Sequence, residues 1–307
     1  MTTPPQFGQP IVQLAQIPGT SLWFAGQTNG DIIYYDAVAG EWVRYPAGPI
    51  GYSLLAQGLG LPAVWAPSGV GTGWTEEGNT WTYAAAAAPE FTLTINADVT
   101  GFIQVGDRIR LTQVGIIRYF IVTQIVYGAP NTTLTLYGGT DYVLANAAIT
   151  SPSYSHVKNP YGFPTDPTRW TVEVQDSIYR TQANPTQNIW YNLGAISISI
   201  PTGSWRVSYQ VSGGVYDDDT LSEARVTLST ANNSESDITM TAEIYISVQA
   251  TLTGLNAMVS MMRERTLVLA SATTLYLNAM TPLASAQSIT FYNSVSTCVI
   301  RAICAYL

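Results

Sequence analysis

Charge is scarce in this chain, and that scarcity limits the kind of surface it can present. Only 32 of its 307 residues are Asp, Glu, Lys or Arg, with one lysine, Lys158, and one histidine, His156. Soluble globular chains carry roughly 25% charged residues, which keep the surface of a free monomer hydrated. Tyrosine, tryptophan and β-forming residues are abundant instead. We therefore expect much of the surface to be covered by copies of the same chain or by other proteins in a permanent assembly.

The sign of the remaining charge narrows the range of partners. The net charge is −8, which argues against duplex nucleic acid and against an anionic membrane surface, because both need a basic face. No apolar run approaches the roughly 20 residues that span a bilayer. The first ten residues lack the pattern of a signal peptide. We expect no nucleic-acid partner and no membrane insertion.

The two cysteines are expected to be free thiols. Cys298 and Cys304 are six residues apart in a strand-like segment, so their side chains point to one face and lie about 20 Å apart at ~3.3 Å per residue. A disulfide requires Cα atoms within about 7 Å. The pair is therefore expected to be buried and reduced, as in a protein made in a reducing cytoplasm.

Residues 25–90 form a zone rich in glycine and aromatic residues, after a proline-containing tail over residues 1–24. Gly30–Asp36 follows an Asn-Gly turn signal and Glu41–Pro46 follows a glycine, which predicts a small hairpin. A hairpin of this size is marginal in water, so we expect three copies to pack together here. The residues expected in that packing are Tyr34, Tyr35, Trp42, Tyr45 and Trp65. Exposed aromatics of this zone are also suited to stacking on sugars.

Residues 91–165 contain short alternating segments separated by turn signals, which is typical of β-strands. The expected strands are Phe91–Ile95, Asp107–Leu111, Arg118–Tyr127 and Thr133–Tyr137. Four short strands with tight turns favour a small β-barrel or a compact sandwich. The segment before them, Ala84–Pro89, is expected to be a linker or a single helical turn.

Residues 166–307 show longer alternating runs. The expected strands are Trp170–Gln175, Ile189–Leu193, Ile196–Ile200, Trp205–Val211, Glu223–Ser229, Ile238–Ala250, Leu267–Leu269, Thr274–Met280, Ser288–Asn293 and Thr297–Tyr306. Leu255–Glu264 fits a helix or a strand. This number of strands favours a jelly-roll sandwich, and no alternation of strands and helices indicates a doubly wound sheet or an α/β barrel.

Few residues are suited to catalysis. A Ser-His-Asp or Cys-His site must use His156, and no G-x-S-x-G nucleophile motif occurs. One histidine and two separated cysteines cannot fill a tetrahedral zinc site. We expect no catalytic residues, no metal and no cofactor. Glycoside hydrolysis by two carboxylates from distant segments stays open.

One acidic run is the sharpest charged feature. Asp217, Asp218 and Asp219 are chemically able to ligate a hard cation such as Ca²⁺, but they lack the alternating spacing and distal glutamate of an EF-hand loop. We therefore favour a solvated loop tip over a cation site here. Function concentrates in loops on rigid scaffolds. The loop residues expected to contact a receptor are Tyr216, Asp217, Asp218, Asp219, Asn232 and Asn233.

Several segments resemble known proteins. Gly30–Asp36, Trp42–Gly48, Gly51–Leu55 and Pro62–Trp65 resemble a module of tailed-phage fibre proteins with the pattern GDLLYYDG…WVRLPAG…GQVL…P.W, in which the third element is altered here. Segments of the middle zone also resemble structural proteins of phages and prophages. These segments are Val105–Ile109, Tyr137–Tyr142, Gly162–Pro164 and Trp170–Val172. The strand count and length of the last zone are similar to C1q/TNF-like jelly rolls at fibre tips, a likeness of fold alone.

The resemblance implies an elongated, all-β, multidomain homotrimer in a virion, made in the host cytoplasm. Residues 1–24 are expected to dock on a capsid, portal or tail protein, and residues 166–307 to form the outward trimeric jelly roll. The docking residues expected are Pro4, Pro5, Phe7, Pro10 and Leu14. Residues 25–90 are expected to be the hairpin module with its linker, and residues 91–165 a small β-domain.

The function implied is a non-catalytic tail fibre or spike that adheres to a glycan or protein of the host surface. Three identical heads provide avidity, which strengthens weak contacts without adding new ones. A head fibre or capsid decoration protein is the second hypothesis, since it shares the fold and the oligomeric state. A glycan-degrading spike is the third.

Overall fold

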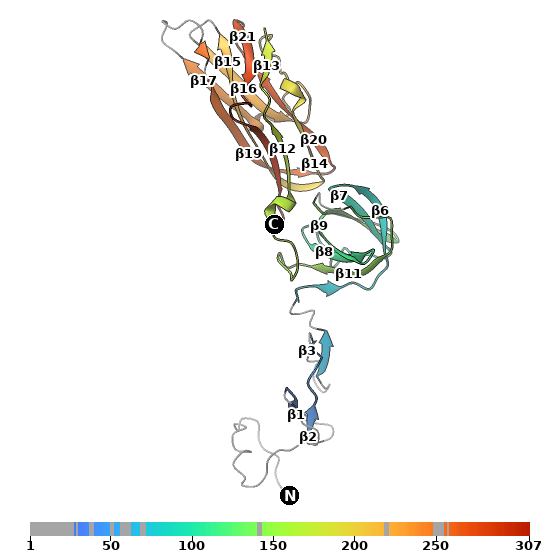
Figure 1. The fold of residues 1–307 in the computed structure, drawn as a ribbon. Helices are drawn as coiled ribbons and strands as arrows, with labels where there is room; N and C mark the ends of the chain where they lie inside the picture. The colour runs from blue at the N-terminus through green and yellow to red at the C-terminus, as the bar shows by residue number, and fades with distance from the viewer. Residues whose placement is uncertain are drawn as a thin grey trace, which may run out of the picture. The chain divides into compact units, whose positions relative to one another are not determined.

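The chain consists almost entirely of β-strands (Figure 1). The computed structural model describes residues 28, 30–36, 40–49, 52–55, 63–67, 72–139, 143–217, 221–247, 255–256 and 258–307. The chain divides into two compact units, Met1–Gly71 and Thr72–Leu307. None of the helices in the described residues is long and apolar enough to span a bilayer. The expectation of an all-β protein is confirmed.

The first unit contains two antiparallel pairs of strands. β1 (Ile32–Asp36) pairs with β2 (Glu41–Tyr45), which confirms the hairpin expected from the turn signals. β3 (Tyr52–Leu55) pairs with β4 (Val64–Pro67), a pair that the proline- and glycine-rich sequence there did not predict. The expected docking residues Pro4, Pro5, Phe7, Pro10 and Leu14 lie outside the described residues.

In the second unit, residues 72–155 form one seven-stranded sheet, which we call the curled domain. Its strands are β5 (Thr75–Glu76), β6 (Trp81–Ala87), β7 (Glu90–Ile95), β8 (Arg108–Gln113), β9 (Ile116–Gly128), β10 (Asn131–Tyr137) and β11 (Ile149–Ser155), in the order β5-β11-β8-β9-β10-β7-β6. The sheet bends until β6 approaches β11 and encloses an apolar core (Figure 1). All four strands expected in this region are confirmed.

The expectation of a linker or helical turn at Ala84–Pro89 is wrong. Most of this segment belongs to β6, which pairs with β7 from Trp81 to Ala87 with one bulge after Tyr83. Alanine favours helix by its local propensity, but the ladder to β7 and the burial of Trp81 outweigh that small preference. Residues 72–90, which we had assigned to the preceding zone, therefore supply two strands of the curled domain.

Residues 171–304 form a sandwich of two antiparallel sheets. One sheet holds β12 (Thr171–Asp176), β13 (Arg180–Ala183), β15 (Gly203–Asp217), β18 (Leu255–Asn256), β19 (Val259–Leu269), β21 (Ala286–Phe291) and β22 (Cys298–Cys304). The other has the order β14-β20-β16-β17, with β14 (Ser197–Ile200), β16 (Leu221–Ser229), β17 (Thr241–Ser247) and β20 (Thr273–Met280). Short 3-10 turns flank the strands at Pro167–Trp170, Leu193–Ala195 and Ile238–Met240.

The long strand β15 organises the first sheet. Along one side it pairs with β19 from Gly203 to Gly213. Along the other side it pairs first with β22 and then with β21. Its inward side chains, including Trp205, Val207 and Tyr209, are buried in the core between the sheets.

One expectation for the last zone is wrong, and one open alternative is decided. Ile189–Leu193 is not a strand, because Tyr191 makes only an isolated bridge to Ala279 before a 3-10 turn begins. The helical alternative for Leu255–Glu264 also fails, since β18 and β19 pair with β15 over this stretch. Ile238–Ala250 is a strand only from Thr241, after a 3-10 turn capped by Asp237. The remaining expected strands are present with shifted ends.

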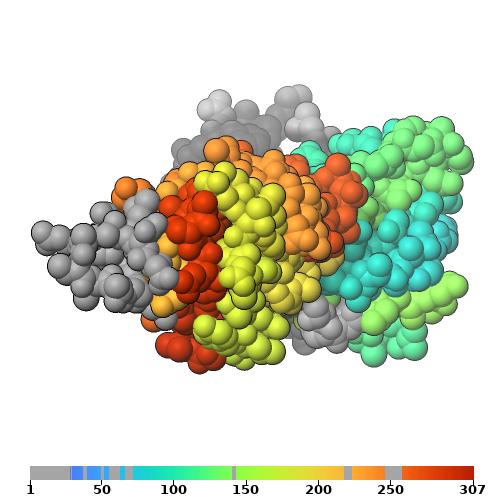
Figure 2. All heavy atoms as spheres, turned by 90° about the horizontal axis from the view of Figure 1, so that it is seen from above, coloured from blue at the N-terminus to red at the C-terminus, as the bar shows by residue number. Residues whose placement is uncertain are grey.

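A buried arginine joins the curled domain to the sandwich. Arg108 donates from Nε to the carbonyl of Lys158 at 2.9 Å, from Nη1 to that of Gly106 at 2.6 Å and from Nη2 to that of Tyr306 at 2.9 Å. Its guanidinium carbon lies 5.1 Å from the centre of the Phe163 ring. The two parts are in direct contact in the space-filling view (Figure 2).

Candidate functional site

Several residues of the first unit converge on one carboxylate. Asp31 accepts hydrogen bonds from the amides of Thr28 at 2.7 Å and Ala47 at 2.8 Å, and from Arg44 Nε at 2.7 Å. The two amides, with Arg44, hold the pKa of Asp31 well below its ordinary range. Asp31, which directly precedes β1, therefore ties the start of this strand to the end of β2 and to the loop after β2.

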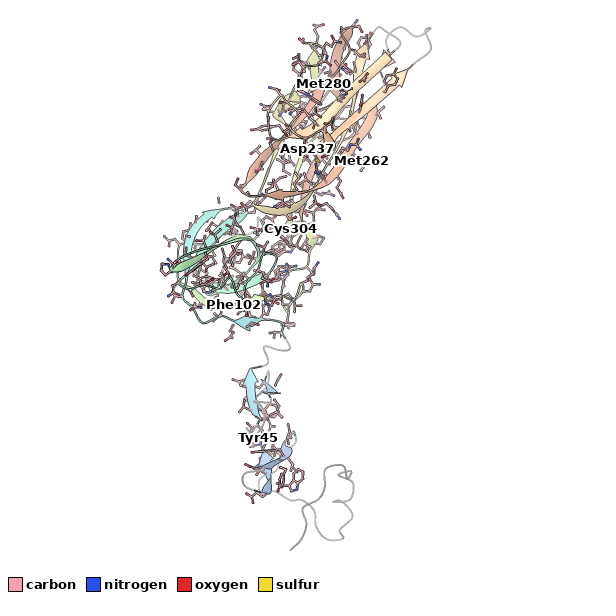
Figure 3. The ribbon with its side chains drawn as sticks, turned by 180° about the vertical axis from the view of Figure 1, so that it is seen from behind. Tyr45, Phe102, Asp237, Met262, Met280 and Cys304 are labelled. Carbon is pink, nitrogen blue, oxygen red and sulfur yellow. The ribbon has the colours of Figure 1, made fainter. Side chains whose placement is uncertain are left out.

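The tryptophan of the pattern completes this module. Trp65 donates from its indole nitrogen to the Pro46 carbonyl at 2.8 Å and stacks on Tyr45 with ring centres 6.1 Å apart. A Cβ added at Gly48 would lie only 2.4 Å from the Trp65 ring. Glycine at this position is therefore needed for the indole to pack on the backbone. We call residues 28–67 the aromatic module; Tyr45 is labelled in it in Figure 3.

The five aromatic residues expected to pack between copies divide into two groups. Tyr34 lies edge-on to Tyr45 at 5.8 Å, and with Trp65 these rings form a half-buried cluster within the chain. Tyr35 and Trp42 face each other across the β1–β2 ladder with ring centres 5.5 Å apart. They stay 53% and 39% exposed. The second pair is therefore the one left available to a partner.

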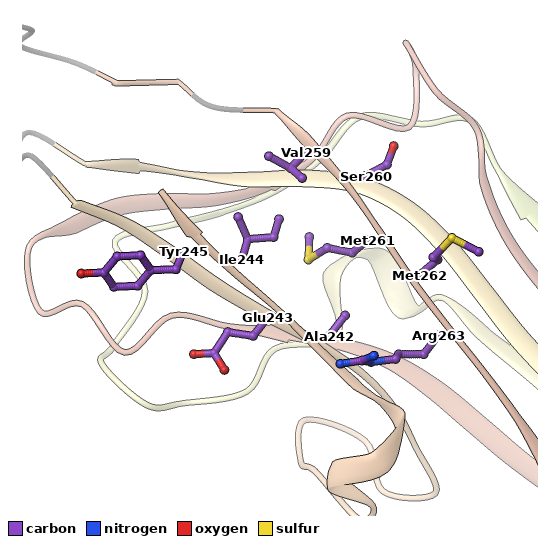
Figure 4. A pocket seen from close by; sticks show the side chains of 9 residues that line it. All are labelled: Ala242, Glu243, Ile244, Tyr245, Val259, Ser260, Met261, Met262 and Arg263. Carbon is purple, nitrogen blue, oxygen red and sulfur yellow. The ribbon is translucent and has the colours of Figure 1, made fainter. Parts of the chain in front are cut away.

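A second candidate surface lies at one edge of the sandwich, which we call the β17–β19 edge. A groove of 480 Å³ runs between β17 and β19 (Figure 4). Ala242, Ile244 and Met261 line it on the core side, and Met261 is buried. Glu243 and Tyr245 project from β17 toward solvent.

Arginines bridge the two sheets below this groove. The register places positions 263 and 265 of β19 opposite the inward residues Tyr209 and Val207 of β15. Arg263 donates from Nε to the Thr241 carbonyl at 2.8 Å, and Arg265 lies 2.6 Å from Asp237 Oδ2. Inward-pointing charges of this kind keep an edge strand from pairing indiscriminately.

A charged triplet lies beside the groove on the outer face of β16 and β17. Arg225 Nη2 is 2.9 Å from Glu243 Oε1 and 3.2 Å from Glu223 Oε1. Burial raises the pKa of Glu223, whereas the hydrogen bond from Arg225 lowers the pKa of Glu243. The two carboxylates share one arginine, which offsets one of their two negative charges.

The sequence did not lead us to this edge, although it carries two signals. Four of the six methionines lie between positions 240 and 262, and eight of the 32 charged residues lie between Glu223 and Arg265. Both groupings come from segments that only the fold brings to one edge. Figure 3 labels Met262 and Asp237 there.

The residues expected to contact a receptor are dispersed. Asp217 is 1% exposed at the end of β15 and accepts a hydrogen bond from Ser285 Oγ at 3.0 Å, so a solvated loop tip is wrong for this residue. Asp218 and Asp219 lie outside the described residues, whereas Tyr216 is half-buried in β15. Across the described ranges, no group of three or more His, Cys, Asp and Glu is placed to hold a metal ion.

Asn232 and Asn233 lie in an exposed turn after β16. Asn233 adopts a φ of 55°, accepts from the amide of Asn192 at 2.6 Å and donates its own amide to Asn278 Oδ1 at 3.2 Å. Asn233 therefore has a structural role in holding this turn, and Asn232 presents an exposed side chain.

The histidine and the cysteines have local roles. His156 Nδ1 lies 2.8 Å from Asp107 Oδ1, and Asp107 also accepts the Gln104 amide at 2.7 Å. Cys298 and Cys304 are buried free thiols, as expected. Burial raises the pKa of Cys298 to about 12 and that of Cys304 to about 11, so both thiols stay protonated.

Comparison with known proteins adds little. No protein-family model matches the chain, and no curated protein matches it. A solved structure, dimeric latent PorU from Porphyromonas gingivalis, aligns with 74% of this chain and 24% of its own at 8% identity and a TM-score of 0.27. The chain thus spans about a quarter of that protein, and a similarity at this level carries no argument about fold or function.

Proposed function

We propose that this chain is a structural, non-catalytic subunit of a tailed-phage virion, a homotrimeric fibre or spike that adheres to the host surface. The observation that carries the proposal is the aromatic module. Its fibre-like residues Asp31, Arg44 and Trp65 all serve to build the module. Such a role fits a part used for assembly rather than for chemistry.

The exposed pair in the module supports assembly with further copies. A two-stranded hairpin is marginal in water by itself, and Tyr35 and Trp42 remain exposed on β1 and β2. Aromatic side chains of this type are enriched in protein interfaces. Three copies around an axis would cover both rings and stabilise each hairpin.

The strand order of the sandwich supports an outward jelly-roll head. Its nested pairs are β12 with β22, β14 with β20, β15 with β19 and β16 with β17. Numbered from one to eight, these strands pair first with last, second with seventh, third with sixth and fourth with fifth. Eight strands wound in this way form a jelly roll, a fold that hosts many functions and supports this one by analogy alone.

The mass of the purified full chain tests the assembly. Sedimentation velocity at micromolar concentration is expected to give three copies, and a single dissolved copy would overturn the proposal. Replacing both exposed rings, as Tyr35→Ser with Trp42→Ser, is expected to weaken the trimer. Replacing the exposed Tyr161 of the other unit, as Tyr161→Ser, serves as the control.

Immunogold labelling of intact particles tests the location. Label at the tail supports a tail fibre or spike, whereas label over the capsid replaces that assignment by a head fibre or decoration protein. Incubation with host polysaccharide tests the absence of catalysis. Shortened chains would show a glycan-degrading spike instead.

A further inference from the structure

The β17–β19 edge has no role in the function proposed above. Within the described residues, β17 pairs only with β16, and β19 pairs only with β15 and on one side. The two strands therefore face each other across the groove, and neither has a strand partner on that side within the described residues. β19 is 11 residues long, and a long open edge is a place where another chain can associate. Because the inward arginines oppose strand pairing, we expect that association to use side chains over the groove rather than a shared ladder.

Several side chains around the groove are of types that are common in protein interfaces. Tyr245 and Met262 are each 66% exposed, and Met258 is half exposed. Interfaces are enriched in tyrosine, methionine and arginine. Methionine adapts its shape to an apolar partner. A protein partner therefore fits this edge better than a polar ligand does.

The local charge indicates which protein that partner is. The arginines at the edge are Arg206, Arg225, Arg263 and Arg265, and the carboxylates are Glu223, Glu235, Asp237, Glu243 and Glu264. These groups nearly cancel, whereas the whole chain carries −8. Two identical acidic chains repel each other over most of their surfaces, and least where one of them is locally neutral.

We propose that the β17–β19 edge is the surface on which a second copy of this chain packs. The groove receives apolar side chains of the neighbour, and Tyr245 and Met262 are covered on its two sides. The proposal rests on the proposed function for the existence of a permanent homo-oligomer. It adds the place where the heads of that oligomer meet.

A substitution that introduces a charge at the β17–β19 edge of the full chain tests the proposal. Met262→Glu places a carboxylate where the neighbour is apolar, and the side chain is exposed enough that the monomer tolerates it. Sedimentation velocity is expected to show association at least tenfold weaker than in the wild type. Val295→Glu is the matched control, because Val295 is 72% exposed in the turn between β21 and β22. Circular dichroism confirms that both variants fold.

The outcomes separate this inference from the function on which it rests. If Met262→Glu stays as associated as wild type, or if Val295→Glu dissociates equally, the edge is not the interface and the virion role stands. If the wild-type chain is itself a single copy, the trimeric function fails and this inference fails with it.

Crosslinking supplies a measurement that needs no destabilised variant. A photo-crosslinking phenylalanine analogue in place of Tyr245 is expected to join two copies of the purified chain, as seen in the doubled mass of the product. Failure to form that product in an oligomeric sample would overturn the proposal. So would a product that joins this position only to another protein when intact particles are irradiated.

Discussion

In the sandwich, Trp205, Val226 and Leu277 are completely buried between two sheets, whereas no apolar residue of the aromatic module for which the structure gives an exposure is fully buried. The module relies instead on Asp31, which ties together the segments around β1 and β2, and on stacked rings. Burial of apolar area is the dominant stabilising term in folding. The sandwich therefore has what it needs to be stable as one copy, while the module gains from neighbours.

The two regions also use aromatic residues differently. Trp205 meets Tyr137 of the curled domain edge-on at 4.8 Å and fills the core. Tyr35 and Trp42 meet each other at a similar distance, 5.5 Å, but in solvent. The same ring-to-ring geometry thus serves the interior in one region and leaves a surface open to a partner in the other.

The largest effect is expected from truncating the sandwich core. Trp205→Ala should lower the free energy of unfolding by about 3–5 kcal/mol, because it removes a fully buried indole and leaves a cavity. Trp42→Ala in the module should leave the free energy of unfolding within about 0.5 kcal/mol of the wild-type value. Urea unfolding followed by far-UV circular dichroism at low protein concentration measures both. An equal loss of unfolding free energy in the two variants would show that the two regions do not differ in how they are stabilised.

The next largest effect is expected at the joint between the curled domain and the sandwich. Arg108→Met leaves three carbonyl groups without their donor, and a buried unsatisfied polar group costs about 1–3 kcal/mol. We expect a loss of about 2–3 kcal/mol in the same unfolding measurement. The stability of Arg108→Lys should lie between that of the wild type and that of Arg108→Met, because an ammonium cannot reproduce the planar arrangement of donors.

Arg301→Met is the matched control for this joint. Arg301 forms an exposed ion pair with Glu173, and such pairs contribute no more than about 1 kcal/mol. A loss at Arg301 as large as that at Arg108 would show that burial of the guanidinium is not what matters.

A smaller effect is expected from closing the space under Trp65. Gly48→Ala places a methyl group against the indole and should displace it from the Pro46 carbonyl, at a cost of about 1–3 kcal/mol within the module alone. The indole N–H signal of Trp65 in proton NMR is expected to move toward its solvent-exposed position. Gly78→Ala is the control, because nothing lies within 4 Å of the added carbon. An unmoved Trp65 signal would exclude the close packing at Gly48.

The smallest effect is a shift in one titration. Asp31 has a lowered pKa in the folded module, so the unfolded chain binds more protons below about pH 4 and the stabilisation is lost as the pH falls through that range. The Ala47 amide donates to Asp31, so its proton chemical shift should follow the ionisation of Asp31. The midpoint of that titration should lie well below the ordinary aspartate pKa of about 3.9. Asp31→Asn should abolish the titration. A midpoint near 3.9 in the wild type would show that Asp31 does not hold the module together.

Local patterns were sufficient where each residue's neighbours in sequence decide its structure. The alternation in Trp205–Val211 predicted an inward apolar face that the structure confirms, because successive side chains of a strand point to opposite sides. The turn signals around Gly30 and Gly40 predicted the hairpin. The spacing of Cys298 and Cys304 predicted two buried free thiols.

The sequence fell short in two different ways. At Ala84–Pro89 the partner strand β7 is the next one in the chain, and the helical propensity of alanine outweighed the strand signal in our expectation. Leu255–Glu264, which fits a helix or a strand by its sequence, is extended because β15, some 50 residues earlier, offers a ladder. Asp217 is polar in sequence and buried in the fold, where Ser285 reaches it. No local window contains the partners of Leu255–Glu264 or of Asp217.

The sequence by itself determined the all-β class, most of the strands and the aromatic residues of the module, because period-two alternation and turn chemistry act over a few residues. Only the tertiary structure decided which strands became edges, and so where Met262, Tyr245 and the arginines of β19 meet at one groove. Pairing between distant segments sets which backbone groups are satisfied and which side of a strand stays open. That choice is a property of the whole chain and leaves no mark in any single stretch of it.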